Sequence, residues 1–278
     1  MRRIASAREV LGELAAIRRA AADFRTNLFA APEHLEAWSA SGLLFGVQGV
    51  GATLLLRREA SAWRLYFAAT DLAALGAVLH GDLAHGPDPL VADLVGSQAA
   101  TTSVVEVFAA AGFRRHRRLE RMAAPAGGSG AADRAATGGT RVRRAGLRDE
   151  IAVRALLEAS FDRLAEPLPD QPELIRAIEE QRVLVAGREG AVRGALVFET
   201  QGRRSLLQFW AVVPEARAEG IGSALMRTYL SSHREVRRFL LWVDSANRRA
   251  IAAYRHYRFE ADGLIDDVVV GERAGWTA

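Results

Sequence analysis

The chain has 278 residues, of which 50% are hydrophobic and 25% are charged, so it is long enough for two domains with buried cores. Its formal net charge is +4, and the absence of cysteine excludes structural disulfides and thiolate catalysis. No apolar run reaches the ~18 residues that a membrane span needs, and no secretory signal begins the chain. We therefore expect a soluble, cytoplasmic protein without a membrane partner.

Patterns in the first 80 residues predict alternating helices and strands. Ser6 and Glu9 form a capping pair ahead of the first helix. The predicted elements are a helix to about residue 21, a short helix after Pro32, strands at 43–47, 52–57 and 63–68, and a helix from Thr70 and Asp71 to residue 79.

Two further features of the first half suggest ligands but have simpler explanations. The loop 80–88 contains His80 and His85, yet no third ligand has suitable spacing, so we expect no metal site. All 37 basic residues are arginine, and the densest run is 114–118 with Arg121. Because no aromatic platform accompanies this run, we interpret it as the solvated edge of a strand and do not expect a nucleic-acid partner.

A stretch poor in large apolar residues divides the chain. Residues 123–139 are mostly Ala, Gly, Ser and Thr and read as a linker between domains at 1–122 and 140–278. The elements predicted in the second half are strands at 141–145, 182–186, 191–199, 204–213, 239–243 and 264–270, and helices at 147–161, 172–181, 222–230 and 247–257.

The stretch 206–230 carries the most informative pattern. An apolar strand bounded by Pro214 precedes Arg217, Gly220 and Gly222, and an amphipathic helix begins there. Unpaired N–H groups and the positive end of the helix dipole favour an anion at this position. Glycine lets a phosphate approach the backbone closely, so the pattern predicts a phosphate site.

This strand, the Gly-rich turn and the later segment 247–259 resemble the acyl-CoA-binding core of the GNAT superfamily of N-acyltransferases. The family signature, Arg or Gln, two residues, Gly, one residue, Gly or Ala, is complete in Arg217, Gly220 and Gly222. The resemblance implies an α+β fold with a mixed, mostly antiparallel sheet flanked by helices. It also implies acetyl-CoA as the co-substrate, with no metal.

The resemblance also implies roles for individual residues. The main-chain N–H of Trp210 matches the oxyanion donor, Tyr254 matches the general acid, and Asn247 matches a residue that contacts the pantetheine arm. The full set of implied coenzyme contacts is Trp210, Ala211, Val212, Val213, Arg217, Ala218, Glu219, Gly220, Ile221, Gly222, Ser223, Asn247 and Tyr254.

The general base and one turn depart from the family pattern. Many relatives carry a Glu where this chain has Leu206 or Gln208, neither of which accepts a proton usefully. The other titratable groups, for which spacing gives no support, are Glu199, Asp244, His256 and Asp266. A water chain or an acceptor amine of low pKa would make a dedicated base unnecessary. Arg258 stands where the family usually has Gly.

The first half contains an echo of the second. Residues 101–113 align without a gap with 247–259, so that Phe113 matches Phe259. No phosphate turn precedes the first copy, and Thr101 and Phe108 replace Asn247 and Tyr254. Chance similarity of two amphipathic helices is the alternative. We predict two tandem GNAT-like domains, the first degenerate and non-catalytic.

The predicted function is transfer of an acetyl or other acyl group from acetyl-CoA to an amine of a small molecule or peptide. The alternative is a non-catalytic acyl-CoA-binding sensor or interaction module, and a carrier protein as acyl donor also remains open. The expected acceptor region contains the acidic residues Asp162, Glu166, Asp170, Asp266 and Asp267, which favour a cationic amine or a basic peptide. The sequence does not decide the oligomeric state, and a homodimer is one possibility.

Overall fold

The computed structural model describes residues 1–59, 61–81, 83, 89–126, 141–187, 191–217, 219–233 and 235–271. The chain forms two compact units. Unit 1 comprises Met1–Leu119 and the chain from Gly263 on, and unit 2 comprises Glu120–Asp262. No helix in these ranges is long and apolar enough to cross a membrane.

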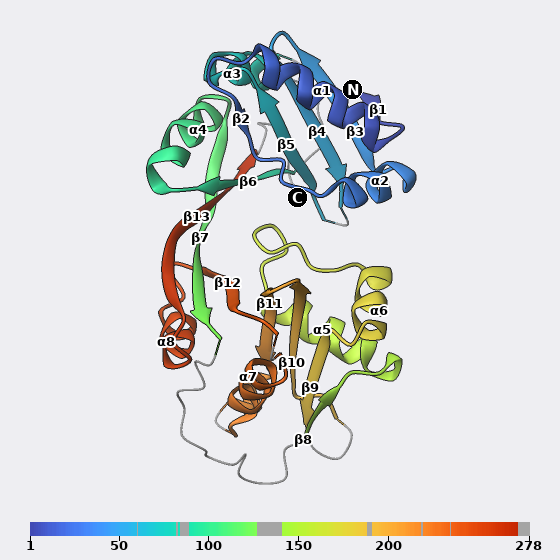
Figure 1. The fold of residues 1–278 in the computed structure, drawn as a ribbon, viewed down its shortest axis with the longest axis vertical. Helices are drawn as coiled ribbons and strands as arrows, with labels where there is room; N and C mark the ends of the chain where they lie inside the picture. Colours follow the sequence, from blue (N-terminus) through green and yellow to red (C-terminus); the bar gives the residue numbers. More distant parts are fainter. Residues whose placement is uncertain are drawn as a thin grey trace. The chain divides into compact units, whose positions relative to one another are not determined.

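Unit 1 is a sheet with helices on both faces (Figure 1). Its elements are β1 (Arg2–Arg3), α1 (Ala7–Ala20), β2 (Arg25–Thr26), α2 (Pro32–Ala40), β3 (Leu44–Gly49), β4 (Ala52–Arg58), β5 (Trp63–Ala69), α3 (Leu72–Gly81), β6 (Leu90–Gly96), α4 (Gln98–Ala110) and the first part of β7 (Phe113–Pro125). The strand order is β1-β3-β4-β5-β6-β13-β7, and β2 pairs with β5. The β5–β6 pair is parallel, whereas β3–β4, β4–β5 and β6–β13 are antiparallel.

Alternation along the strands gives unit 1 two cores. Leu54 and Leu56 of β4 point to the core shared with α3 and α4, and Leu55 points to the core shared with α1 and α2. The last strand of the chain, β13 (Glu260–Gly271), adds Val269 to the first of these cores. Unit 1 therefore includes a strand from the far end of the sequence.

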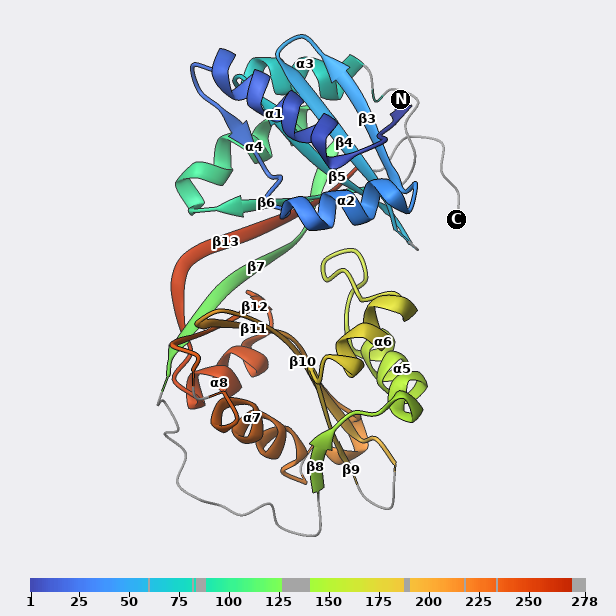
Figure 2. The same cartoon turned by 45° about the vertical axis from the view of Figure 1, so that its right-hand side comes forward.

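Unit 2 has the same layered construction. Its elements are β8 (Arg141–Arg144), η1 (Leu147–Asp149), α5 (Glu150–Ser160), α6 (Gln171–Glu179), β9 (Val183–Gly187), β10 (Gly194–Gln201), β11 (Arg204–Val212), η2 (Pro214–Ala216), α7 (Ile221–Ser231), β12 (Arg238–Asp244) and α8 (Arg248–His256). The strand order is β7-β12-β11-β10-β9-β8. In Figure 2, α7 and α8 cover one face of this sheet and α5 and α6 the other. The two cores again use alternate strand residues, such as Leu196 and Val197 of β10.

The predicted fold class, an α+β protein with a mixed, mostly antiparallel sheet, is confirmed. The predicted domain bounds stay predictions. The compact units differ from them because Ala123–Pro125 belong to β7 and the chain from Gly263 packs with unit 1. The rest of the predicted linker, from residue 127, lies outside the described residues, as does most of the loop with His85. Strands β1, β2 and β6 were not predicted.

Candidate functional site

Strands β11 and β12 of unit 2 separate halfway along their length. They pair in parallel from Arg204↔Arg238 to Leu207↔Leu241, and the register ends there although both strands continue. On the other side, β11 keeps its antiparallel pairing with β10, but Gln208 is an extra residue between the pairs Phe198↔Leu207 and Val197↔Phe209. Such a bulge bends a strand and disrupts its ladder locally. From Gln208 to Val212, β11 has no β12 partner in the described part of the chain, and we call this unpaired edge the gap.

The direction of the β11 amides follows from one hydrogen bond. The N–H of Val213 donates to the carbonyl of Arg193, on the β10 side, at 2.9 Å. Because successive residues of a strand direct their polar groups to opposite sides, the N–H groups of Trp210 and Val212 face the gap. Of the predicted contacts on this strand, Ala211 and Val213 direct theirs toward β10.

The Gly-rich turn leads from the gap into α7. Gly220 has φ +77°, and an added Cβ there would meet nothing within 4 Å. The first bond of the helix runs from the Ala224 N–H to the Gly220 carbonyl, and no side chain among the described residues caps this end. The amides of Ile221, Gly222 and Ser223 therefore precede the first intrahelical bond and can donate to an anion.

The other residues of the turn have more varied surroundings. Arg217 is exposed, and its Nε lies 3.4 Å from the carbonyl oxygen of Val212, at the end of β11. The Glu219 N–H donates to Ala216, and its carboxylate pairs with Arg193 at 2.8 Å. Ala218 lies outside the described residues. Arg217 is thus available to a ligand, whereas the Glu219 amide already has an acceptor.

Trp210 joins the gap to the helix. A Cβ on Gly222 would come within 3.1 Å of Trp210 Cζ2, so glycine gives the indole room against the first turn of α7. The indole Nε1 is buried and has no hydrogen-bond acceptor in the described part of the chain. A buried donor without a partner is unusual. The open space at Gly220 fits a phosphate-bearing ligand.

Tyr254, on α8, lies beside Trp210 of β11. The two ring centroids are 5.4 Å apart, and Tyr254 is buried. Burial raises the pKa of its phenol well above the usual range, and the charge of Glu166 acts in the same direction. The hydroxyl therefore stays protonated at working pH and can act as a proton donor.

Asn247 has a structural role at the start of α8. Its Oδ1 accepts a hydrogen bond from the Ala250 N–H at 3.0 Å, which is the usual N-cap arrangement. The residue is exposed, and its side-chain amide group still has two hydrogens to donate.

The candidate bases lie in different surroundings. Glu199 and Gln208 are both exposed, and Gln208 Nε2 lies 3.5 Å from Glu199 Oε2. The Asp244 carboxylate accepts from the Ala246 N–H, and His256 is exposed on α8. Asp266 belongs to unit 1. The bulge at Gln208 was not predicted from the sequence, because a single polar residue in an apolar strand is equally typical of an ordinary exposed position.

The acidic residues predicted to attract a cationic acceptor are divided between the units. Asp170 caps α6 through the Glu173 N–H, and Asp162 accepts from the Leu164 N–H. In unit 1, the buried Asp267 carboxylate pairs with Arg118 through two contacts of 2.8 Å. These carboxylates stabilise local structure.

One known protein family matches part of the second half. The Acetyltransferase (GNAT) family matches residues 151–259. No curated protein matches the sequence.

Among solved structures, a GCN5-related N-acetyltransferase from Sphaerobacter thermophilus covers 100% of this chain and 96% of its own, with 19% identity and a TM-score of 0.62. A tandem GNAT protein from the clavulanic acid biosynthesis pathway covers 81% of this chain and 80% of its own, with 15% identity and a TM-score of 0.58. A GCN5-related N-acetyltransferase from Kribbella flavida covers 86% and 94%, with 17% identity and a TM-score of 0.58. At these identities the similarity shows the fold. Residues 151–259 therefore match the acetyltransferase (GNAT) family, and the chain shares the fold of a tandem GNAT protein.

Proposed function

We propose that unit 2 transfers an acetyl or other acyl group from acetyl-CoA to an amine of a small molecule or peptide. The observation that carries this proposal is the gap between β11 and β12. The N–H groups that face it, on Trp210 and Val212, lead to the uncapped start of α7. An extended ligand with amides at one end and phosphates at the other matches this order of donors.

Each part of the coenzyme has residues suited to it. Arg217 and the amides of Gly220, Ile221, Gly222 and Ser223 would hold the pyrophosphate. The Val212 N–H would pair with an amide of the pantetheine arm, and the side-chain amide of Asn247 would donate near the thioester. When bound, acetyl-CoA supplies an activated acyl group. The protein then has to orient it, stabilise developing charge and provide a proton.

Trp210 and Tyr254 meet the last two needs. The Trp210 N–H would donate to the acyl oxygen as it gains negative charge, which is the role of an oxyanion hole. The phenol of Tyr254 would give its proton to the departing sulfur, and its raised pKa keeps that proton in place beforehand. In the balanced reaction a C–N bond forms and the C–S bond breaks. Sulfur takes the phenol proton, water takes the amine proton, and that proton returns through water to the Tyr254 phenolate.

The acceptor would enter as the neutral amine, because no carboxylate beside Trp210 is assigned as a base. Protonated amines cannot attack a carbonyl carbon. We therefore expect kcat/KM to rise with pH until the pH reaches the pKa of the acceptor amine. Ionisation of Tyr254 should cause no fall in kcat/KM below about pH 10.

The test is release of free thiol from acetyl-CoA with a panel of amines and peptides, using wild type, Tyr254→Phe and Tyr257→Phe. Tyr257 is a buried tyrosine at the end of the same helix and serves as the matched control. We expect kcat to fall by about 100-fold or more in Tyr254→Phe, in the range of general acid catalysis. The KM for acetyl-CoA should be unchanged, and Tyr257→Phe should retain activity.

Other outcomes would redirect the proposal. Tight acetyl-CoA binding without turnover on any amine would favour the non-catalytic acyl-CoA-binding module. Equal activity of Tyr254→Phe and wild type would remove Tyr254 from the mechanism. Absence of binding would contradict the assignment of the turn from Arg217 to Gly222.

A further inference from the structure

Unit 1 contains a gap of the same kind as unit 2. Its parallel strands β5 and β6 pair at Trp63↔Leu90 and Arg64↔Val91, where the register ends although both strands continue. The third residue of β5 beyond the last pair is Phe67. In β11 the third residue beyond the last pair is Trp210, the predicted oxyanion donor. The two positions are therefore topological counterparts.

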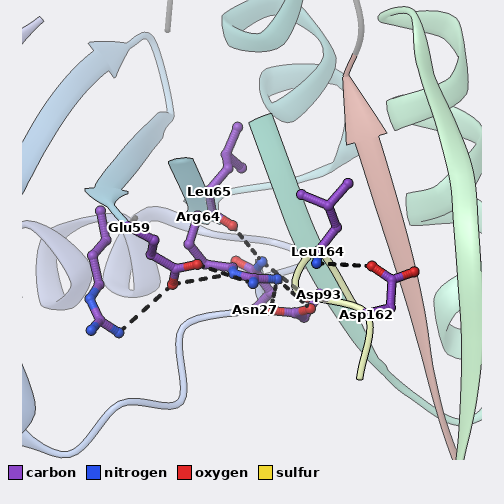
Figure 3. Close-up of polar contacts among 8 residues, drawn as sticks. Asn27, Glu59, Arg64, Leu65, Asp93, Asp162 and Leu164 are labelled. Atoms are coloured by element: carbon purple, nitrogen blue, oxygen red, sulfur yellow. Dashed lines mark hydrogen bonds and ion pairs between the residues drawn. The ribbon is translucent and has the colours of Figure 1, made fainter. Parts of the chain in front are cut away.

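The side chain of Asn27 bridges the two strands at this gap (Figure 3). Its Nδ2 donates to the carbonyl of Leu65 on β5 at 3.0 Å and to the carbonyl of Asp93 on β6 at 3.1 Å. Its Oδ1 accepts the N–H of Phe67 at 2.7 Å. Asn27 is 8% exposed, so these bonds form away from solvent. A primary amide thus satisfies the backbone groups that the separation of β5 and β6 leaves open.

The segment before Asn27 covers the next part of the same edge. Strand β2 pairs with β5 in antiparallel register, Arg25↔Ala69 and Thr26↔Ala68. The Thr26 hydroxyl donates to the Phe67 carbonyl at 2.7 Å. The edge of β5 from Leu65 to Ala69 is therefore bonded to residues 25–27 of the same chain.

The helix that follows the gap is also satisfied from within. The Asp71 carboxylate accepts the Ala74 N–H at 2.8 Å, and the first bond of α3 runs from the Leu75 N–H to the Asp71 carbonyl. A carboxylate at a helix N-terminus accepts one of its free amides and places a negative charge where an anion would bind. At the corresponding end of α7 in unit 2, Gly220 leaves the amides uncapped.

We infer that the gap between β5 and β6 in unit 1 binds residues of its own chain. Asn27 and β2 take the place of an amide-bearing arm, and Asp71 takes the place of a phosphate. Only an amide-bearing, phosphorylated ligand that displaced both could enter, so the chain binds one acyl-CoA, in unit 2. The number of acyl-CoA sites rests on the function proposed for unit 2. The self-binding of unit 1 rests only on the hydrogen bonds within unit 1.

Two measurements test these parts separately. Calorimetric titration of the full chain with acetyl-CoA should give one site. Two sites would overturn the inference. No binding would contradict the function proposed for unit 2, and the second measurement would then decide whether unit 1 binds its own chain.

The second measurement is amide hydrogen exchange at Phe67, read by NMR without ligand in wild type, Asn27→Ala and Thr102→Ala. Thr102 is an exposed residue of unit 1 and is the matched control. The Phe67 amide should be protected in wild type and the control, and should exchange at least about 100-fold faster in Asn27→Ala. Asn27→Ser, which shortens the side chain, should act in the same direction if the alanine variant does not fold. Fast exchange in wild type, or unchanged exchange in a folded Asn27 variant, would overturn the self-binding.

Discussion

The two units open their sheets at corresponding places but satisfy the opening differently. In unit 1 the exposed strand edge is bonded to Asn27 and β2, and Asp71 caps the following helix. In unit 2 the N–H of Trp210 faces an open gap, and Gly220 leaves the start of α7 uncapped. The comparison shows that an internal amide and an internal carboxylate distinguish a strand edge bonded within the chain from an open one in the same fold.

The physical reason lies in the cost of unpaired backbone groups. A buried N–H or C=O without a partner costs about 1–3 kcal/mol, so a strand edge inside a protein must be bonded to something. Unit 1 meets this need with its own residues. Unit 2 leaves it to water or a ligand, which makes its edge a place where binding recovers free energy.

The largest stability effect is expected where unit 1 is closed. Asn27→Ala removes three hydrogen bonds and leaves buried groups on Leu65, Phe67 and Asp93. We expect the free energy of unfolding to fall by about 3 kcal/mol or more, since each of the three unsatisfied groups costs about 1–3 kcal/mol. Chemical denaturation measures it, with Thr102→Ala expected to stay within about 0.5 kcal/mol of wild type. A loss under 1 kcal/mol would show that water replaces the amide at little cost.

The next effect transfers the unit 1 cap to unit 2. Gly220→Asp places a carboxylate at the phosphate turn, and Gly220→Asn places a neutral group of the same shape at the same left-handed position. We expect acetyl-CoA to bind about tenfold more weakly to the Gly220→Asp variant than to the Gly220→Asn variant. This difference corresponds to about 1.4 kcal/mol of interaction with the helix dipole and the added charge. Calorimetry checks this difference. Equal affinities would mean that the α7 terminus does not carry the phosphate.

A smaller effect concerns one buried aspartate in each unit. Burial and the charge of Asp93 raise the pKa of Asp266, so the folded state holds that proton more tightly than the unfolded chain. Stability from this group is complete below the unfolded pKa of about 3.9 and declines as pH rises toward the folded pKa. Arg143 and burial act in opposite directions on Asp149, and the hydrogen bond from Arg143 prevails, which lowers its pKa. Its stabilisation is present above about pH 3.9 and is lost as pH falls through the lower folded pKa.

These opposite signs can be separated with two variants. Relative to wild type, Asp266→Asn should gain stability as pH rises from 4 to 7, whereas the deficit of Asp149→Asn should shrink as pH falls below 4. Thermal unfolding across this range measures both differences. Parallel pH profiles for Asp266→Asn and wild type would show that the Asp266 pKa is not raised.

The smallest effect compares two matching turns. Gly112 in unit 1 has φ +89°, and Arg258 at the matching position of unit 2 has φ +64°. A left-handed backbone costs a non-glycine residue about 1–2 kcal/mol, part of which glycine returns as unfolded-state entropy. We therefore expect Arg258→Gly to raise the free energy of unfolding by about 0.5 kcal/mol, and Gly112→Arg to lower it by more. The opposite order in denaturant midpoints would contradict this account.

The sequence predicted unit 2 better than unit 1 because its signals are local. Gly220 and Gly222 follow an apolar strand directly, and helix periodicity marks α7 and α8. Strand β2 has two residues, too few to show any period, and Asn27 becomes meaningful only through partners on β5 and β6. The gap itself depends on where a strand register ends, which no single stretch of sequence encodes. The place of β13 in unit 1 was not predicted either, since its partner β6 lies far away in the chain.

The most direct test follows the amides of Trp210 and Phe67 in one sample by hydrogen exchange, before and after addition of acetyl-CoA. The account predicts that the Trp210 amide exchanges quickly at first and slows when acetyl-CoA binds, whereas the Phe67 amide is slow throughout. A Phe67 amide that becomes protected only with acetyl-CoA, or a Trp210 amide that is unaffected by bound acetyl-CoA, would contradict it.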